Sequence, residues 1–398
     1  MDHPKRYSRL PEYAFPRLRR LLDAHPGGGE ILHMSIGEPK HAFPEFVPDV
    51  IARNAHEFGK YPPAEGTREL REAIAAWLEQ RYALKRPDPD TDIINLNGTR
   101  EGLFNACLAL SPEEKNGKKP VVLLPNPFYQ VYMVAALTAG AEPVFLPTSA
   151  ESGFLPDFDA VPEDLLERTT IAYMCSPSNP QGAVASETYW QKLIGLAEKY
   201  DFKLFADECY SEIYRETPPA GALKAAQTIG ADPNRVVVFH SLSKRSNLPG
   251  LRSGFAASGP ENIAELKQLR AYAGAPLPMP LQRAAEAVWA DEAHVDVNRD
   301  LYRRKFALAD RILGNVPGYR SAEAGFFLWI EVEDGEATTL RLWQETGVRV
   351  LPGAYLSKEN DARLGGGNPG ERFIRVALVA PEAEVVRGLQ AIAATLGG

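Results

Sequence analysis

Cysteine is scarce in this sequence, with three residues among 398. Cys107, Cys175 and Cys209 are odd in number and show no C-x-x-C pairing, which argues against a disulfide framework and a zinc site. All three have apolar neighbours, so we expect them to pack as small hydrophobic side chains. The seven histidines include no H-x-x-x-H pair on an expected helix. The sequence therefore carries no metal signature.

Long apolar runs and an excess of positive charge are also lacking. No run approaches the roughly 20 apolar residues that a membrane helix needs, and the first residues lack the apolar centre of a signal peptide. A formal net charge of -8 argues against nucleic acid or an anionic membrane as a partner. We therefore expect a cytoplasmic protein that acts on a small molecule.

Residues 121–258 show a regular alternation of short apolar runs with helical or loop segments. This alternation predicts an α/β fold in which a mainly parallel sheet is sandwiched by helices. Neither a Walker sequence nor G-x-G-x-x-G occurs, so the common nucleotide-binding motifs are absent. The runs that we interpret as strands are 121–124, 143–146, 170–174, 202–206, 236–239 and 254–257.

The character of the chain changes after about residue 280. A long helical stretch at 294–314 is followed by strand-like runs at 326–332 and 373–379, with the short run 348–351 between them and helices near 338–346 and after Pro381. Helices on a small sheet predict a smaller α+β domain. We divide the chain into an N-terminal arm with part of the small domain (1–45), a large domain (46–285) and a small C-terminal domain (286–398).

Lys244 follows the apolar run 236–239, at the strand end where open α/β sheets bind their ligands. Hydroxyls at Ser241 and Ser243 and a positive charge at Arg252 would hold a phosphate beside the reactive amine. Pyridoxal phosphate is the biological aldehyde with these properties, and lysine binds it covalently. A lone S-x-S-K more often belongs to an ordinary surface loop, so the other strand ends must decide.

Two further stretches supply candidates for a phosphate and a flat ring. The segment 97–102 opens a helix, so the backbone N–H groups of Thr99 and Arg100 can point at an anion. Tyr129 follows the run 121–124, where its ring could stack on a heterocycle. A helix cap and a core aromatic side chain are the alternative interpretations.

Two more strand ends supply polar groups for a ring. Asn179 lies in a turn after the run 170–174 and could donate to a phenolate oxygen, or bond its own backbone. Asp207 ends the run 202–206, and a buried carboxylate there needs a cation such as a protonated pyridine nitrogen. Tyr210 could reach the 3-oxygen of the same ring. Together, these stretches provide a candidate for every polar group and face of pyridoxal phosphate.

On these motifs the sequence resembles the fold-type I pyridoxal-phosphate aminotransferases of the aspartate aminotransferase superfamily, from Gly37 to beyond Arg375. The resemblance implies a fold-type I architecture with Lys244 as the covalent anchor. It implies that Arg375 binds the substrate α-carboxylate and that Gly37 closes over it. It also implies that Tyr61 contacts the phosphate of the neighbouring subunit, and hence a homodimer with active sites at the subunit interface.

More narrowly, the stretches S-I-G-E-P-K-H, N-P-F-Y-Q-V-Y and S-L-S-K-R-S-N are similar to bacterial succinyldiaminopimelate transaminases of lysine biosynthesis. The resemblance implies conversion of N-succinyl-LL-2,6-diaminopimelate and 2-oxoglutarate to N-succinyl-2-amino-6-oxopimelate and glutamate. Candidate donors to the distal carboxylates are Tyr13, Lys40, His41 and Arg100. The alternatives are a general or aspartate-type aminotransferase, a pyridoxal-phosphate lyase on the same scaffold, and a non-enzymatic binding protein with this fold.

Overall fold

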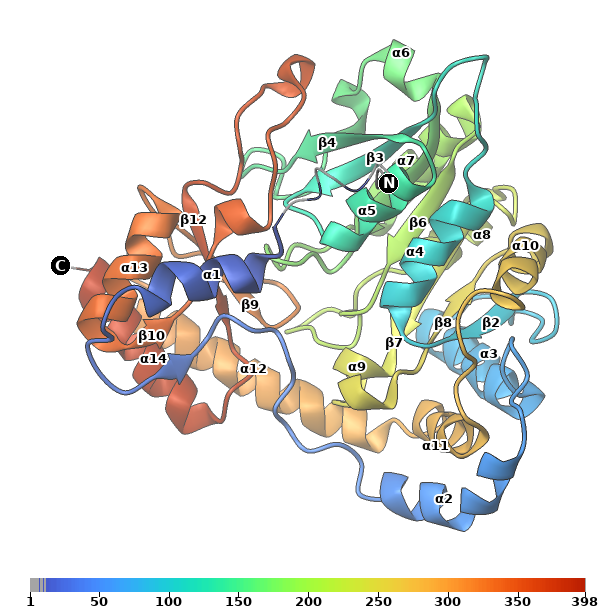
Figure 1. The fold of residues 1–398 in the computed structure, drawn as a ribbon, viewed down its shortest axis with the longest axis horizontal. Helices are drawn as coiled ribbons and strands as arrows, with labels where there is room; N and C mark the ends of the chain where they lie inside the picture. The colour runs from blue at the N-terminus through green and yellow to red at the C-terminus, as the bar shows by residue number, and fades with distance from the viewer. Residues whose placement is uncertain (1–6, 8–9, 11, 398) are drawn as a thin grey trace, which may run out of the picture.

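A seven-stranded sheet is the largest sheet of the computed structural model, which describes residue 7, residue 10 and residues 12–397 (Figure 1). Neighbouring strands pair in parallel, except that β8 runs antiparallel to both of its neighbours. The carboxyl ends of the parallel strands therefore meet at one edge, where such sheets bind ligands. The strand order is β2 (Ile93–Leu96), β8 (Gly254–Ala257), β7 (Val236–Ser241), β6 (Lys203–Asp207), β5 (Thr169–Cys175), β3 (Val121–Asn126) and β4 (Glu142–Pro147).

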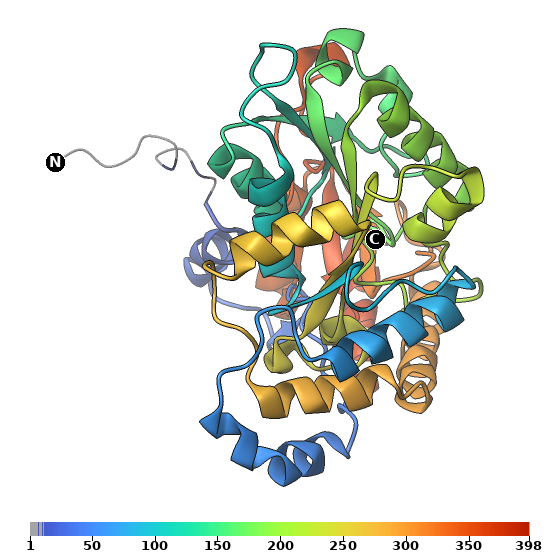
Figure 2. The same cartoon turned by 90° about the vertical axis from the view of Figure 1, so that its right-hand side faces the viewer.

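Side chains of each strand alternate between two cores, one on each face of this sheet. In β6, Leu204 packs into the first core and Phe205 into the second. Because both faces are covered (Figures 1 and 2), the strands are mostly apolar on both sides and not alternately polar and apolar. The longer helices that contribute to the first core are α3 (Arg68–Tyr82), α7 (Glu187–Tyr200), α8 (Ala222–Ile229) and α11 (Met279–Trp289). Three contribute to the second: α4 (Thr99–Leu110), α5 (Gln130–Thr138) and α10 (Pro260–Arg270).

A smaller antiparallel sheet has the order β11 (Leu351–Pro352), β12 (Phe373–Ala377) and β9 (Phe327–Glu331). Apolar side chains of four helices pack around its strands: α1 (Ala14–Asp23), α12 (Ala293–Leu313), α13 (Gly335–Thr346) and α14 (Glu382–Leu396). The short strand β1 (Leu32–His33) pairs in parallel with β10 (Val348–Arg349), so an N-terminal segment joins C-terminal elements. The domain boundaries at residues 45 and 285 stay a prediction.

The 21-residue helix α12 connects the two regions of the molecule. One end packs under the small sheet through Phe306 and Leu313. The other end reaches the four-residue helix α9 (Leu242–Arg245), which carries Lys244 (Figure 1). The remaining α-helices are α2 (Val47–Arg53) and the short α6 (Glu163–Leu166). Nowhere in the described part of the chain is a helix both long enough and apolar enough to cross a membrane.

The strands expected between residues 121 and 258 are confirmed, and two features differ from the expectation. Strand β2 was not predicted, because Asn95 interrupts an apolar stretch of only four residues. The run 348–351 was given no assignment, and it contains two short strands, since β10 pairs with β1 and β11 pairs with β12. Short runs of this kind do not reveal their pairing partners from local pattern alone.

Replacing Leu204 by Ala should lower the free energy of unfolding by about 3 kcal/mol, since it removes a fully buried side chain and leaves a cavity at the centre of the first core. Urea unfolding followed by circular dichroism measures this loss. Val297→Ala on α12 is the control, because that side chain is largely exposed. Equal unfolding midpoints for the two variants would contradict the assignment of Leu204 to a closely packed core.

Candidate active site

Apart from Lys40 and His41, which are described below, all but one of the predicted site residues line a single cavity of about 580 Å³ at the carboxyl edge of the large sheet. The exception is Tyr61, whose side chain lies outside the cavity and is fully exposed. Its expected role in the site of a neighbouring subunit stays a prediction. The residues that line the cavity are Tyr13, Gly37, Thr99, Arg100, Tyr129, Asn179, Asp207, Tyr210, Ser241, Ser243, Lys244, Arg252 and Arg375.

Lys244 holds its amine in the wall of the cavity. It lies on α9, directly after β7, and its Nζ donates a hydrogen bond of 2.7 Å to the carbonyl of Gly37. Burial lowers the pKa of Lys244 to about 8, and the positive charges of Arg375 and Arg252 act in the same direction. About a tenth of the amine is therefore neutral at pH 7, and the neutral amine is the form that acts as nucleophile or base.

Asp207 brings a buried carboxylate to the end of β6. Burial raises the pKa of Asp207, while hydrogen bonds from Tyr132 and from the backbone of Cys209 favour its ionised form. The Tyr132 hydroxyl donates to Asp207 Oδ2 at 2.6 Å. Tyr132 was not among the site residues predicted from the sequence. Its position three residues after Tyr129 could have indicated a role, because this spacing places both rings on one side of α5.

An anion-binding site forms where α4 begins. Gly98 has φ of 81°, in the left-handed region that favours glycine, and a Cβ there would collide with the Arg252 guanidinium. The guanidinium therefore lies directly against the helix start, beside the N–H group of Thr99. Ser243 donates its backbone N–H to the Ser241 hydroxyl, which in turn donates to Ser243 Oγ at 2.8 Å. This donor set suits a phosphate.

The rings of Tyr129 and Tyr210 line the cavity together with the anion-binding site and Lys244. The Tyr129 hydroxyl accepts a hydrogen bond from Arg100 Nε at 2.7 Å, which fixes the ring at the start of α5. Tyr210 is buried, and within the described ranges its hydroxyl has no hydrogen-bond partner. Burial is the main cause that raises the pKa of both phenols. A flat ring with an oxygen substituent would meet a stacking surface and an available donor here.

Arg375 presents a buried guanidinium without a carboxylate partner among the described residues. It donates to Asn179 Oδ1 at 3.0 Å and to the carbonyl of Ser35 at 2.8 Å, whereas its Nε has no partner in the described part of the chain. Burial lowers its pKa to about 10. A buried cation of this kind is suited to a bidentate pair with a carboxylate that enters the cavity.

Lys40 and His41, the other candidates for reading distal carboxylates, do not line the cavity. Lys40 is exposed and pairs with Glu38 at 3.2 Å. His41 is turned to the interior, where it bonds to Asn298 and Lys305. The structure therefore gives no support to the expectation that these two side chains bind a substrate carboxylate, which stays a prediction.

The three cysteines pack against apolar side chains as expected, Cys107 in the second core and the other two beside Tyr210 and Phe326. Cys175 and Cys209 both line the cavity, and Cys209 Sγ lies 3.1 Å from Thr99 Oγ1. Desolvation by burial raises the pKa of both thiols, so they are not poised as nucleophiles. Across the residues that the structure describes, no cluster of three or more His, Cys, Asp or Glu side chains is arranged to hold a metal ion.

The family model for aminotransferase class I and II matches residues 29–392. The chain belongs to this family. It is a pyridoxal-phosphate-dependent aminotransferase, and the predicted fold class is confirmed. The cavity fits that cofactor, since it combines a phosphate-binding helix start, a buried carboxylate and a lysine amine.

Relatives of this aminotransferase align over nearly its whole length. The chain is 30% identical to an LL-diaminopimelate aminotransferase of Dehalococcoides mccartyi, over 99% of this chain and 98% of that protein. An aminotransferase from Neisseria meningitidis has a similar structure, with a TM-score of 0.93 and 38% identity over 98% of this chain and 99% of the other. A probable N-succinyldiaminopimelate aminotransferase from Thermus thermophilus has a TM-score of 0.83 and 26% identity over 96% and 100%.

In the cofactor-free aminotransferase, the rate at which Lys244 combines with pyridoxal phosphate should rise with pH around a midpoint near 8, because the neutral amine is the reactive form. Stopped-flow absorbance from about pH 6 to about pH 10 measures this profile. Nα-acetyl-lysine is the reference, with a midpoint above about pH 10. A protein profile that matches the reference would show that burial does not control the amine.

Replacing Tyr132 by Phe should raise the pKa of Asp207, because the lost hydrogen bond favours the ionised carboxylate. If catalysis requires ionised Asp207, the acid limb of the profile of kcat/KM against pH should move to higher pH in this variant. Tyr173→Phe is a matched control, since Tyr173 is an equally buried tyrosine stacked on Tyr132 whose hydroxyl bonds to the Leu103 carbonyl instead. Coincident acid limbs in both variants would remove Tyr132 from the control of Asp207.

Proposed function

We propose that this aminotransferase converts N-succinyl-LL-2,6-diaminopimelate and 2-oxoglutarate to N-succinyl-2-amino-6-oxopimelate and glutamate. The observation that carries the proposal is the number of cationic side chains in the cavity. Arg252 would hold the cofactor phosphate, Arg375 the α-carboxylate, and Lys244 the covalent bond. Arg100 lines the same cavity and is left for a distal carboxylate. Both substrates of this reaction carry such a group.

Side chains of the cavity would divide the chemistry between them. When bound, pyridoxal phosphate supplies an aldehyde that bonds amino groups and a ring that accepts electrons. Lys244 would move the proton from the α-carbon of the substrate, because its lowered pKa leaves the amine partly neutral. Asp207 would keep the ring nitrogen protonated, and Tyr132 would hold the Asp207 carboxylate in place.

The orientation of the substrate would depend on the guanidinium of Arg375. Two parallel hydrogen bonds to the α-carboxylate fix its plane, and Asn179 supports the guanidinium from the side. Gly37 lies at the rim, where a Cβ would collide with the ring of Phe327. The segment around Gly37 can therefore pack closely over the carboxylate. Thr99, Ser241 and Ser243 would complete the phosphate site, and Tyr129 and Tyr210 would contact the ring.

The distal carboxylate would meet Arg100 and Tyr13. Arg100 is exposed, its Nε donates to the Tyr129 hydroxyl, and its guanidinium also interacts with Tyr13, so a substrate carboxylate would join this pair of contacts. Tyr13 lies at the N-terminus of α1 and lines the same side. A contact at the mouth suits a site that accepts both a short chain, as in glutamate, and a long succinylated one.

Unsuccinylated LL-diaminopimelate is a second candidate substrate. Relatives named LL-diaminopimelate aminotransferase support it, and so does Glu38, a carboxylate of the cavity lining that could bind the distal ammonium group. Succinylation removes that ammonium charge. Glu38 already pairs with Lys40, which favours the succinylated substrate over the free diamine.

A homodimer with shared active sites is part of the proposal. Tyr61 is fully exposed, and the side chain of Phe58, on the same segment, is also largely exposed. Exposed aromatic side chains close together favour burial against a partner. In the dimer, Tyr61 of one subunit would reach the cofactor phosphate of the other.

The substrate proposal predicts that Arg100→Gln lowers kcat/KM about tenfold for glutamate and for N-succinyl-LL-2,6-diaminopimelate, because it removes one charge-assisted contact. The same variant should leave alanine, which has no distal carboxylate, nearly unaffected. Arg375→Lys is the contrasting variant, and it should weaken every amino and keto acid because a point charge cannot replace the fork. Steady-state kinetics across this panel measure both patterns.

Three outcomes would replace the proposal with an alternative. A higher kcat/KM for LL-diaminopimelate than for its succinylated form would favour the free diamine as substrate. Equal use of oxaloacetate, phenylpyruvate and aliphatic keto acids would favour a general or aspartate-type aminotransferase. Keto acid release without any acceptor would point to lyase chemistry on this scaffold.

A further inference from the structure

Asn298 is a buried side chain that contacts the peptide of Lys244 from outside the cavity. It lies on α12 and is 3% exposed. Its Nδ2 donates to the carbonyls of Lys244 and Arg245, each at 3.3 Å. These are the last two residues of the four-residue helix α9, whose terminal carbonyls lack helical partners. Asn298 therefore caps the helix that carries the reactive amine.

The amide oxygen of Asn298 is fixed as firmly as its nitrogen. It accepts hydrogen bonds from His41 Nδ1 at 2.8 Å and from Asn247 Nδ2 at 3.1 Å. His41 Nε2 accepts from the ammonium of Lys305 at 2.7 Å, which leaves the ring proton on Nδ1, pointing at Asn298. Both donors and both lone pairs of the amide are thus used, and a flipped amide would lose all four bonds.

The hydrogen-bond partners of Asn298 also contact the segment that binds the amine of Lys244. His41 belongs to the segment that follows Gly37, and the Gly37 carbonyl accepts the hydrogen bond from Lys244 Nζ. Asn247 also donates to the carbonyl of Ala42 in that segment, at 3.2 Å. The backbone of Lys244 and its amine are therefore both connected to residues 37–42, and Asn298 joins the two connections.

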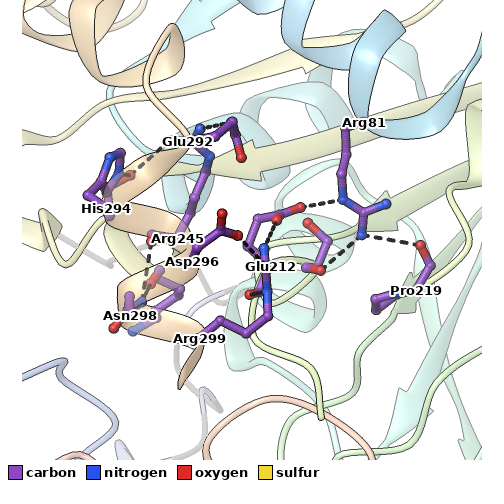
Figure 3. Close-up of polar contacts among 12 residues, drawn as sticks. Arg81, Glu212, Pro219, Arg245, Glu292, His294, Asp296, Asn298 and Arg299 are labelled. Carbon is purple, nitrogen blue, oxygen red and sulfur yellow. Dashed lines mark hydrogen bonds and ion pairs between the residues drawn. The ribbon is translucent and has the colours of Figure 1, made fainter. Parts of the chain in front are cut away.

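Neighbouring side chains hold α12 in place for this task. Arg299 bonds to Glu212 at 2.8 Å, and Arg81 bonds to the same carboxylate at 2.5 Å (Figure 3). Arg245 pairs with Glu292 at the start of α12. Glu212 lies two residues after the cavity tyrosine Tyr210. These ion pairs connect α12 to Glu212 and to α9, and they limit the movement of Asn298.

We propose that Asn298 is a positioning residue for Lys244, which fixes the reach of the amine by joining α9 to segment 37–42. The inference rests on the proposed role of Lys244 as the covalent anchor. It predicts that losing the amide misplaces the amine without altering the side chains that bind the substrate.

The test measures how fast the cofactor-free protein captures pyridoxal phosphate covalently, followed by absorbance and fixed with borohydride. Asn298→Ala should slow capture on the order of tenfold, comparable to losing one or two hydrogen bonds. Asn262→Ala is the matched control, because Asn262 is equally buried and donates to the Asn234 carbonyl and the Ser258 hydroxyl away from the cavity. It should capture the cofactor at the wild-type rate, even if it unfolds as easily as Asn298→Ala.

Steady-state kinetics give a second readout. For Asn298→Ala, kcat should fall about tenfold, while KM for glutamate changes little because Arg375 is untouched. His41→Ala should slow capture in the wild-type background but not in the Asn298→Ala background, since His41 acts through the amide. Asn298→Ser, which keeps one donor, should lie between the wild type and Asn298→Ala, and it serves if the alanine variant does not fold.

Normal capture by Asn298→Ala and Asn298→Ser would overturn the inference, as would an equal loss in Asn262→Ala. Fully additive effects of the His41 and Asn298 substitutions would overturn it as well. Lys244→Ala separates this failure from failure of the proposed site. If Lys244→Ala still captures the cofactor covalently, the assignment of Lys244 is wrong and the inference falls with it.

Discussion

The amine of Lys244 is buried against a backbone carbonyl instead of a carboxylate, and the chemistry of the cavity depends on this arrangement. An adjacent carboxylate would stabilise the ammonium form and return its pKa toward the value of about 10.4 found in water. The two carboxylates that line the cavity are each engaged elsewhere. Asp207 accepts from Tyr132, and Glu38 pairs with Lys40. Neither carboxylate hydrogen-bonds to the amine, so burial outweighs the charge of Glu38, which acts to raise the pKa of Lys244.

The same cavity carries a surplus of positive charge. Arg100, Arg252 and Arg375 line it together with Lys244, and the guanidinium of Arg375 has no carboxylate partner within the described ranges. Buried cations favour a ligand that brings its own negative charge, as a phosphate and a carboxylate do. The protein supplies the fixed donors, and the ligands complete the charge balance.

Much of this arrangement was predictable from local sequence. The apolar runs of the large sheet, the polar residues that follow them and the helix that begins at Thr99 all leave a local signal. Contacts between distant segments leave none. No local pattern distinguishes Tyr132 and Asn298 from other helical residues, and His41 was expected to bind a substrate carboxylate, whereas it bonds to Asn298. Their roles depend on the packing of α5, α12 and segment 37–42 against the sheet, which no window of sequence contains.

The buried ion pairs of Glu212 with Arg81 and Arg299 have a consequence for how this chain can change. Removing Glu212 leaves the two guanidinium groups without their shared carboxylate, at a cost of about 3–5 kcal/mol, whereas replacing all three residues by apolar ones can be nearly neutral. The three residues come from α3, the loop after β6 and α12, which lie far apart in the sequence. A chimaera that exchanges α12 between relatives would therefore have to bring residues 81 and 212 with it.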